Sequence, residues 1–246
     1  MKAARTVIVT GASSGLGFAI AKAYLERGDN VVGNARTHAR LQEAAARLGN
    51  PSNFILVAGD IAKPETAQTL FDQAVAAFGK VDILISNAGI FIPKPVGEYT
   101  EADVDAMINT NLKGFFYPAQ LAARHMAANH SGHIIAITAS IAMQPNIKVP
   151  ALLPVLIKGG LNHAVQGLAL ELAAAQVKVN AVAPGIINTP MHGDSEQLHA
   201  ALKGMSPSGR IGSPQDVVDA VLYLTDSSFV SGAILPVDGG ATAGTW

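Results

Sequence analysis

Short apolar runs alternate with longer amphipathic stretches along the whole chain. The apolar runs are rich in Val and Ile, which favour strands, and turn residues bound them. They predict strands over Thr6–Thr10, Val31–Asn34, Phe54–Ala58, Ile83–Ser86, His133–Ile137, Lys178–Val182 and Ala233–Val237. The stretches between them predict helices over Gly15–Arg27, Ala39–Leu48, Pro64–Phe78, Asp103–Asn129, Pro154–Ala174 and Pro214–Thr225.

This order of elements predicts the fold class. Because the strands are apolar with little alternation, both faces of the sheet must be covered, as in parallel sheets. Repeated strand–helix units then give an α/β protein with a doubly wound parallel sheet and helices on both faces. No linker or repeat divides the chain, so residues 1–246 are expected to form a single domain. The segment from Ile186 to Ser213 has no clear period and is expected to be mobile.

Composition narrows the functional classes. Of the 246 residues, 49% are hydrophobic and 14% charged, which is enough to bury a large core. The formal net charge of -1 gives no overall field that would attract nucleic acid or an anionic membrane. The absence of cysteine excludes disulfides and thiolate chemistry. No apolar run reaches the roughly 18 residues that span a bilayer, and no signal peptide is evident. We therefore expect a cytoplasmic protein without nucleic-acid or membrane partners.

Three glycines lie in the turn between the first predicted strand and the first predicted helix: Gly11, Gly15 and Gly17. In a dinucleotide-binding turn, the first glycine permits the tight turn, the second lets the backbone approach the pyrophosphate, and the third allows close packing. The N-terminus of the helix offers unpaired N–H groups and partial positive charge to the phosphates. The other residues of this turn expected to contact the cofactor are Ser13, Ser14 and Leu16.

The end of the second predicted strand indicates which dinucleotide binds. Proteins that prefer NAD place an acid there, but this strand ends Gly33-Asn34-Ala35-Arg36. Arg36 can instead pair with a 2′-phosphate through its planar guanidinium group, with Thr37 and Ser13 adding hydrogen bonds. The sequence therefore favours NADP as cofactor over NAD. The alternative is that Arg36 is a solvated surface residue.

Further motifs follow in order: Ser86-Asn87-Ala88-Gly89, Asn111, Lys158-Gly159-Gly160-Leu161 and Pro184-Gly185-Ile186-Ile187-Asn188-Thr189. With the glycine turn, they resemble the short-chain dehydrogenase/reductase family over almost all of the chain. The resemblance implies a Rossmann-type sheet and cofactor contacts from Asp60, Ile61, Asn87, Ala88, Gly89, Lys158, Pro184, Gly185, Ile187 and Thr189. Two of these have a structural alternative, because Asp60 could cap a turn and Thr189 could cap a following helix.

The same resemblance implies four active-site residues: a tyrosine, a lysine, a serine and an asparagine. Lys158 matches the lysine, and Asn111 matches the asparagine, whose alternative role is that of a buried amide satisfying backbone groups. Ser140 is assigned as the serine, with a turn cap as its alternative role, although the family spacing selects Ala139 almost equally.

The tyrosine has no match in this sequence. In the family it lies four residues before the lysine and protonates the substrate oxygen, but this chain has Pro154 at that position. A proline has no proton to give, although it is compatible with the first turn of a helix, where its missing N–H is not needed. Tyr99 and Tyr117 stay open as spatial substitutes, without a supporting motif.

The substrate is expected outside the carboxyl ends of the strands, near the nicotinamide. The residues expected to surround it are Ser140, Met143, Leu152, Leu153, Pro154, Met191 and His192. These walls favour a small, largely apolar substrate. No histidine pair has metal-site spacing with nearby acids, so no metal is expected. The resemblance also implies a homo-oligomer, a dimer or a tetramer.

These features support two hypotheses of different classes. The first is an atypical NADP-dependent oxidoreductase that transfers hydride to a carbonyl, enone, quinone or imine substrate. The alternative is a catalytically silent NADP(H)-binding regulatory or structural subunit, since a fold alone does not establish activity. Hydride transfer from NADPH to an acceptor distinguishes the two.

Overall fold

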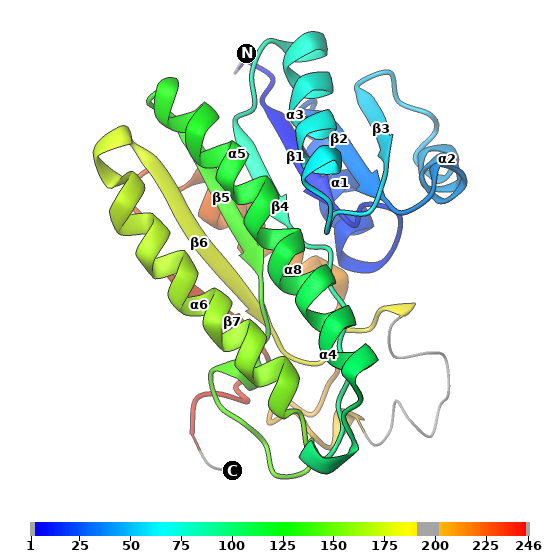
Figure 1. Cartoon of the computed structure of the whole chain (residues 1–246), viewed down its shortest axis with the longest axis vertical. Coiled ribbons are helices and arrows are strands. Elements are labelled where there is room, and N and C mark those ends of the chain that lie inside the picture. The colour runs from blue at the N-terminus through cyan, green and yellow to red at the C-terminus, as the bar shows by residue number, and fades with distance from the viewer. Residues whose placement is uncertain (1–2, 191–201, 245–246) are drawn as a thin grey trace.

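The computed structural model describes residues 3–190 and 202–244. Within them, a seven-stranded parallel sheet has the order β3-β2-β1-β4-β5-β6-β7 (Figure 1). The strands are β1 (Thr6–Thr10), β2 (Asn30–Ala35), β3 (Phe54–Ala58), β4 (Ile83–Ser86), β5 (Gly132–Ile137), β6 (Val177–Pro184) and β7 (Ile234–Val237). The strand order reverses between β1 and β4, which makes a crevice for a ligand at their carboxyl ends. The predicted doubly wound sheet is confirmed.

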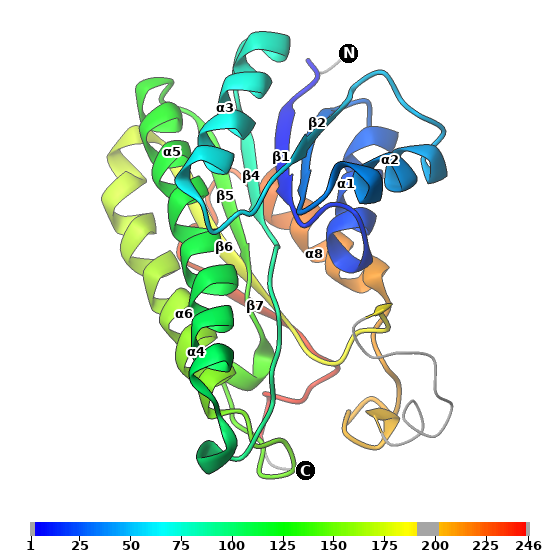
Figure 2. The same cartoon turned by 45° about the vertical axis from the view of Figure 1, so that its right-hand side comes forward.

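Helices cover both faces of the sheet. They are α1 (Gly15–Glu26), α2 (His38–Arg47), α3 (Pro64–Phe78), α4 (Glu101–Met107), α5 (Gly114–Ala128), α6 (Leu152–Leu172) and α8 (Pro214–Asp226). Short 3-10 turns are η1 (Val96–Glu98), η3 (Ser140–Ala142) and η4 (Ala173–Ala175). Helices α3, α5 and α6 form one layer, and α1, α2 and α8 form the other (Figures 1 and 2).

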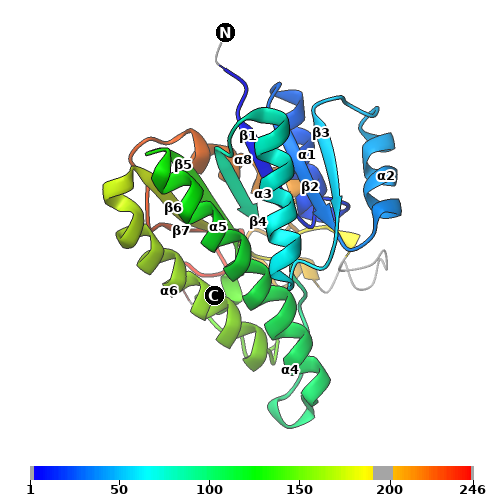
Figure 3. The same ribbon diagram turned by 45° about the horizontal axis from the view of Figure 1, so that its top comes forward.

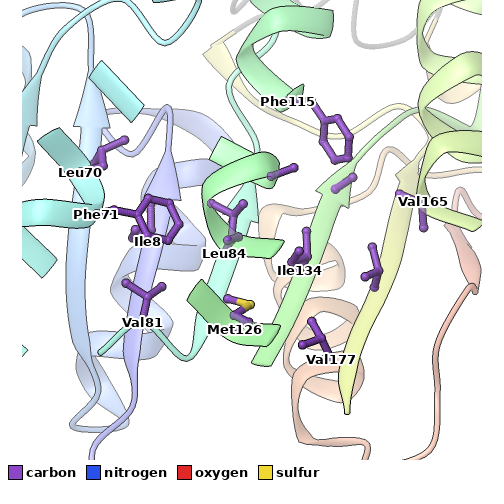
Figure 4. Packing of buried hydrophobic residues seen from close by; sticks show 14 of the residues in the cluster. Ile8, Leu70, Phe71, Val81, Leu84, Phe115, Met126, Ile134, Val165 and Val177 are labelled. Carbon is purple, nitrogen blue, oxygen red and sulfur yellow. The ribbon is translucent and has the colours of Figure 1, made fainter. Parts of the chain in front are cut away.

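The two layers explain the apolar strands. Ile8 of β1 faces the core beneath α3 and α5, whereas Val7 and Val9 face the core beneath α1 and α8, and all three are fully buried. Because successive side chains point to opposite faces, a sheet covered on both sides needs apolar residues at every position. Figure 4 shows Ile8, Leu84 and Ile134 on adjacent strands contributing to one such core.

The helix predicted over Asp103–Asn129 is not α-helical throughout, because a π-helical turn interrupts it. The structure has α4, then a π-helical turn, η2 (Ile108–Lys113), then α5. Helix α4 begins two residues earlier than predicted, because Thr100 Oγ1 accepts from Asp103 N at 3.2 Å while Asp103 Oδ2 accepts from Thr100 N at 2.9 Å. This reciprocal capping box satisfies two backbone donors at the helix start. Figure 3 shows α4 extending past the end of the sheet.

The described residues contain no helix with both the length and the apolarity that a bilayer crossing requires. Residues 191–201 of the segment predicted to be mobile, which include Met191 and His192, lie outside the described residues.

Candidate active site

The turn between β1 and α1 is shaped as a glycine cradle. Gly11 and Gly15 have φ angles of +70° and +55°, a region that favours glycine. A Cβ on Gly17 would collide with the Gly11 carbonyl oxygen and lie 2.5 Å from Asn87 Nδ2. Ser13, Ser14, Gly15 and Leu16 are all partly exposed.

This cradle fits the phosphates of a dinucleotide. The side chain of Ser14, at the N-cap of α1, makes no capping hydrogen bond within the described residues, so it leaves the first N–H groups of the helix open to an anion. The residues that would hold the pyrophosphate are those of the cradle, with their backbone pressed close by the glycines. The φ angles of Gly11 and Gly15 and the close packing at Gly17 are compatible with the roles predicted for these glycines.

A single hydroxyl joins the glycine cradle to the turn after β4. Thr10 Oγ1 accepts hydrogen bonds from the backbone N–H groups of Asn87 and Ala88, each at 3.0 Å. Asn87 Nδ2 returns a hydrogen bond to the Thr10 carbonyl at 2.9 Å. The sequence motifs did not predict this role of Thr10. The available signal was its place at the end of a buried strand, directly before Gly11.

The turn after β4 also meets the residues matched to the family's asparagine and lysine. A Cβ on Gly89 would lie 2.7 Å from Asn111 Oδ1 and 3.4 Å from Lys158 Nζ. Asn111 lies in the π-helical turn and is buried. Its Oδ1 accepts from Ile90 N at 3.0 Å, and its Nδ2 donates to the Ile90 carbonyl at 3.1 Å. The Asn111 amide thus fastens the backbone beside Gly89, so three residues predicted for the site lie together.

Lys158 is buried at the carboxyl end of the sheet. Its side chain comes from α6, is 8% exposed, and donates from Nζ to the Ile137 carbonyl of β5 at 2.8 Å. Burial lowers the pKa of Lys158 to about 8, because the low-dielectric surroundings disfavour its charged form. The amine is therefore still mostly protonated at neutral pH, but it is easier to deprotonate than an exposed lysine.

Pro154 lies one turn before Lys158 and is also buried. Helix α6 begins at Leu152, so Pro154 falls in the first turn, as predicted. The N–H that proline lacks would have no partner within the helix at this position. The helical hydrogen bonds begin one residue later, where Val155 N donates to the Ala151 carbonyl at 2.9 Å.

The candidates for the family's serine lie at the end of β5. Ala139 is partly exposed and extended, with φ −163° and ψ 140°, whereas Ser140 is buried and opens η3. The Ser140 carbonyl accepts from Met143 N at 2.9 Å and from Gln144 N at 3.1 Å, which fixes the turn that follows. The backbone of Ser140 therefore has a structural role whichever of the two positions faces the substrate.

The residues predicted for the adenine end of the cofactor lie after β2 and β3. Arg36 is exposed directly before α2, and in the described part of the chain no ion pair includes it. Asp60 is exposed, and its Oδ1 accepts from Ala62 N at 3.0 Å, which is a turn cap. Ile61 is buried in the core beneath α5, so its side chain packs in the protein interior.

The end of β6 and the segment that follows it reach the glycine cradle. Pro184 and Ile187 are buried, and Gly185 donates from its N–H to the Val237 carbonyl at 2.9 Å. A Cβ on Gly15 would lie 3.7 Å from the Thr189 Cβ, so this segment reaches the glycine cradle. A residue predicted to contact the nicotinamide therefore lies beside the residues predicted to hold the pyrophosphate.

The predicted substrate walls are partly described. Met143 and Leu152 are 42% and 53% exposed, and Leu153 is half-buried. The apolar side chains of Met143 and Leu152 are therefore open to solvent and available to a ligand. Met191 and His192 lie outside the described residues.

The tyrosines considered as substitutes have other contacts. The Tyr99 hydroxyl donates to the Ile92 carbonyl at 2.8 Å and accepts from Lys94 N at 3.3 Å. Tyr117 packs edge-on against Phe116. The described residues contain no cluster of His, Asp or Glu that could hold a metal ion.

A separate hollow of about 510 Å³ lies between α3 and α5, at the opposite end of the sheet. His125 lines this hollow, and its Nε2 accepts from Val81 N at 3.0 Å, near the start of β4. It shares no residue with the site described above.

The sheet, its reversal point and the glycine cradle define a dinucleotide-binding α/β protein. A family model described as enoyl-(acyl carrier protein) reductase matches residues 11–242. The chain is 33% identical over 243 residues to 2-dehydro-3-deoxy-D-gluconate 5-dehydrogenase of Escherichia coli (strain K12), covering 96% of this chain and 94% of that protein. The crystal structure of a short-chain type dehydrogenase/reductase from Mycobacterium marinum superposes with a TM-score of 0.91 and 31% identity, covering 98% and 96% of the two chains.

The chain therefore belongs to the short-chain dehydrogenase/reductase family, and its class is that of NAD(P)-dependent oxidoreductases. Two other structural neighbours carry different nucleotides. ElxO, with NADP bound, has a TM-score of 0.91 and 25% identity over 98% of this chain and 100% of its own. A 3-ketoacyl-(acyl-carrier-protein) reductase from Brucella melitensis, complexed with NADH, has a TM-score of 0.90 and 27% identity over 97% and 98%.

Proposed function

We propose that this protein is an NADP-dependent oxidoreductase that transfers hydride to a small, largely apolar carbonyl, enone, quinone or imine, with an atypical route for the proton. The observation that carries this proposal is Pro154, buried one helical turn before Lys158. The cofactor cradle and the lysine are present, whereas the position from which a family tyrosine would give a proton holds a side chain without one.

The loss of that donor limits the chemistry more than the binding. A general acid contributes roughly 10²–10⁴-fold to rate. The rate gained by holding the hydride donor and the acceptor in the right geometry does not depend on the general acid, so it remains when the acid is lost. Substrates that need no strong protonation during hydride transfer suit such a site: an iminium ion becomes a neutral amine, and an enone or quinone gives a delocalised anion. Simple ketones should react slowly, with Ser140, Lys158, His192 or water as the proton source.

The preference for NADP rests on charge at the adenine end. Arg36 is exposed and has no ion-pair partner in the described part of the chain, and β2 ends at Ala35 without an acid. A guanidinium group binds a phosphate with two parallel hydrogen bonds. We expect Arg36→Ala to weaken NADPH binding by at least about tenfold while changing NADH binding little. Equal losses for both nucleotides, measured by fluorescence titration, would reject Arg36 as the 2′-phosphate ligand.

We further propose a cytoplasmic homo-oligomer, a dimer or tetramer. Support comes from large apolar side chains exposed on adjacent helices of one layer: Phe116 of α5 is 53% exposed, and Leu156 and Leu170 of α6 are 66% and 82% exposed. Apolar surface of this kind is typical of faces that another subunit covers. Light scattering of the purified protein measures the oligomeric state.

The deciding experiment measures NADPH oxidation against a panel of simple ketones, conjugated enones, quinones and cyclic imines. NADPH binding is recorded separately by fluorescence. We expect turnover of the activated acceptors and much slower turnover of the ketones. Tight NADPH binding without oxidation by any acceptor would instead support the silent cofactor-binding subunit. Fast ketone reduction that survives alanine replacement of Ser140, Lys158 and His192 would reject the atypical proton route.

A further inference from the structure

Lys158 brings a positive charge into a poorly hydrated part of the site. Among the described residues, the Ile137 carbonyl is the one acceptor its ammonium group contacts. An ammonium group has three N–H donors, so the others remain available. Asn111 Oδ1 also borders Gly89 and accepts from Ile90 N, but within the described residues it accepts no hydrogen bond from Lys158. The charge is therefore only partly satisfied by the protein.

No carboxylate in the described part of the chain forms an ion pair with Lys158. The elements that contact it contribute Ile137 from β5, Gly89 from the turn after β4, and Asn111 from the π-helical turn, none of which ionises. Burial alone lowers its pKa. Because the surroundings have a low dielectric and no compensating anion, a negative charge that forms nearby is strongly stabilised.

Pro154 removes the group that would stand between this charge and a substrate. It lies on the same side of α6 as Lys158, one turn nearer the start of the helix, and carries neither a donor nor a charge. In a site with a phenol at this position, the lysine acts through the phenol. Here a substrate oxygen has no phenol to contact.

We propose that Lys158 itself stabilises the oxyanion that forms on the substrate, and that the enzyme therefore selects conjugated enones and quinones over iminium ions. This inference rests on the proposed oxidoreductase function. Bound NADPH supplies the hydride with its electron pair. On an enone, the new C–H bond forms at the β-carbon, the C=C π pair shifts toward the carbonyl, and the oxygen becomes an enolate beside the ammonium. The enolate then takes a proton from water, giving the saturated ketone.

An iminium ion behaves in the opposite way. It enters the site as a cation, so the charge of Lys158 repels it. The repulsion is released only as hydride transfer neutralises the ion, so the lysine lowers kcat/KM, which is measured from the free iminium ion. Removal of the ammonium group should therefore lower kcat/KM for an enone and raise kcat/KM for an iminium ion. This difference separates a catalytic role of Lys158 from a role in holding the cofactor alone.

The test compares kcat/KM for 2-cyclohexen-1-one with that for 1-methyl-1-pyrrolinium in one protein preparation. Taking the ratio within each variant cancels any loss of cofactor affinity. We expect Lys158→Met to lower the enone-to-iminium ratio at least about tenfold, and Lys158→Arg to retain part of it. Lys22→Met, which removes an exposed cation of α1, serves as the control and should leave the ratio unchanged. A ratio that Lys158→Met does not change overturns the inference.

A binding measurement decides the inference without turnover. Calorimetry compares 4-nitrophenolate, an anion that mimics the enolate, with 4-nitroanisole, its neutral methyl ether, on the protein saturated with NADP. We expect the wild type to prefer the phenolate at least about tenfold and Lys158→Met to lose this preference. Equal affinities of the wild type for the two compounds overturn the inference. Absence of turnover on every acceptor, with the phenolate preference intact, would reject the oxidoreductase proposal but retain the anion site.

Discussion

Replacing Pro154 by tyrosine asks whether one missing phenol explains the altered site. Positions 154 and 158 are one turn apart on α6, and both are buried. Side chains four residues apart on a helix have Cβ atoms roughly 5–6 Å apart. A lysine charge about 5 Å from the phenol oxygen is worth ~3 kcal/mol at an effective dielectric near 20. That energy corresponds to roughly two pKa units and would bring the phenol pKa from about 10 to about 8.

A phenol with a pKa close to the working pH is an effective general acid. We therefore expect Pro154→Tyr to raise the turnover of simple ketones at least about tenfold, which is ~1.4 kcal/mol of barrier. The assay follows NADPH oxidation over a carbonyl panel, with NADPH affinity and Tm measured on the same protein. Pro154→Phe is the matched control, because it adds the ring without the hydroxyl and should give no gain.

One result would refute this reasoning. If Pro154→Tyr is folded and binds NADPH as tightly as the wild type, yet reduces ketones no faster than Pro154→Phe, then the phenol is not the only missing part. Overpacking has a separate signature. Forcing a ring into a filled site costs ~1–3 kcal/mol and would lower the Tm of both variants.

Two other positions give predictions of a different kind. Gly17→Ala places a methyl group against the Gly11 carbonyl, so we expect a lower Tm and NADPH affinity reduced at least about tenfold; unchanged affinity would contradict the cradle. Burial lowers the pKa of His125 below 6.5, so the unfolded chain takes up the proton more readily than the folded chain does. The contribution of neutral, buried His125 to the free energy of unfolding is therefore at its maximum above about pH 6.5. It decreases as the pH falls below that value, because the unfolded chain is protonated first. Urea unfolding at about pH 7.5 and about pH 5.5 should show this loss in the wild type and less of it in His125→Gln, and equal losses would argue against His125.

Local patterns in the sequence were sufficient to predict the sheet and the glycine cradle. Val7, Ile8 and Val9 are apolar because both sides of β1 are covered, and Gly11 and Gly17 mark a turn whose geometry few other residues can adopt. These signals lie within a few neighbouring residues, so they can be interpreted without knowing the rest of the fold.

Features that depend on distant segments could not be predicted. The role of Thr10 depends on N–H groups 77 and 78 residues away, and the contact of Lys158 depends on a carbonyl 21 residues away. The assignment of Ser140 against Ala139 depends on a shift of one residue at a strand end, which moves a side chain to the other face. Hydrophobic periodicity carries no information on any of these.

The π-helical turn at Ile108–Lys113 has a consequence for how this family member can vary. Each residue of an α-helix turns the chain by about 100°, so the additional residue in the wide turn rotates α4 by about that angle relative to α5. Deleting one residue there would leave a continuous helix but would swing Asp103, and the Lys94 it pairs with at 2.7 Å, to another side. No substitution reproduces this change. Diversity around α4 is therefore expected to arise through insertions and deletions of single residues in this helix as well as through exchange of side chains.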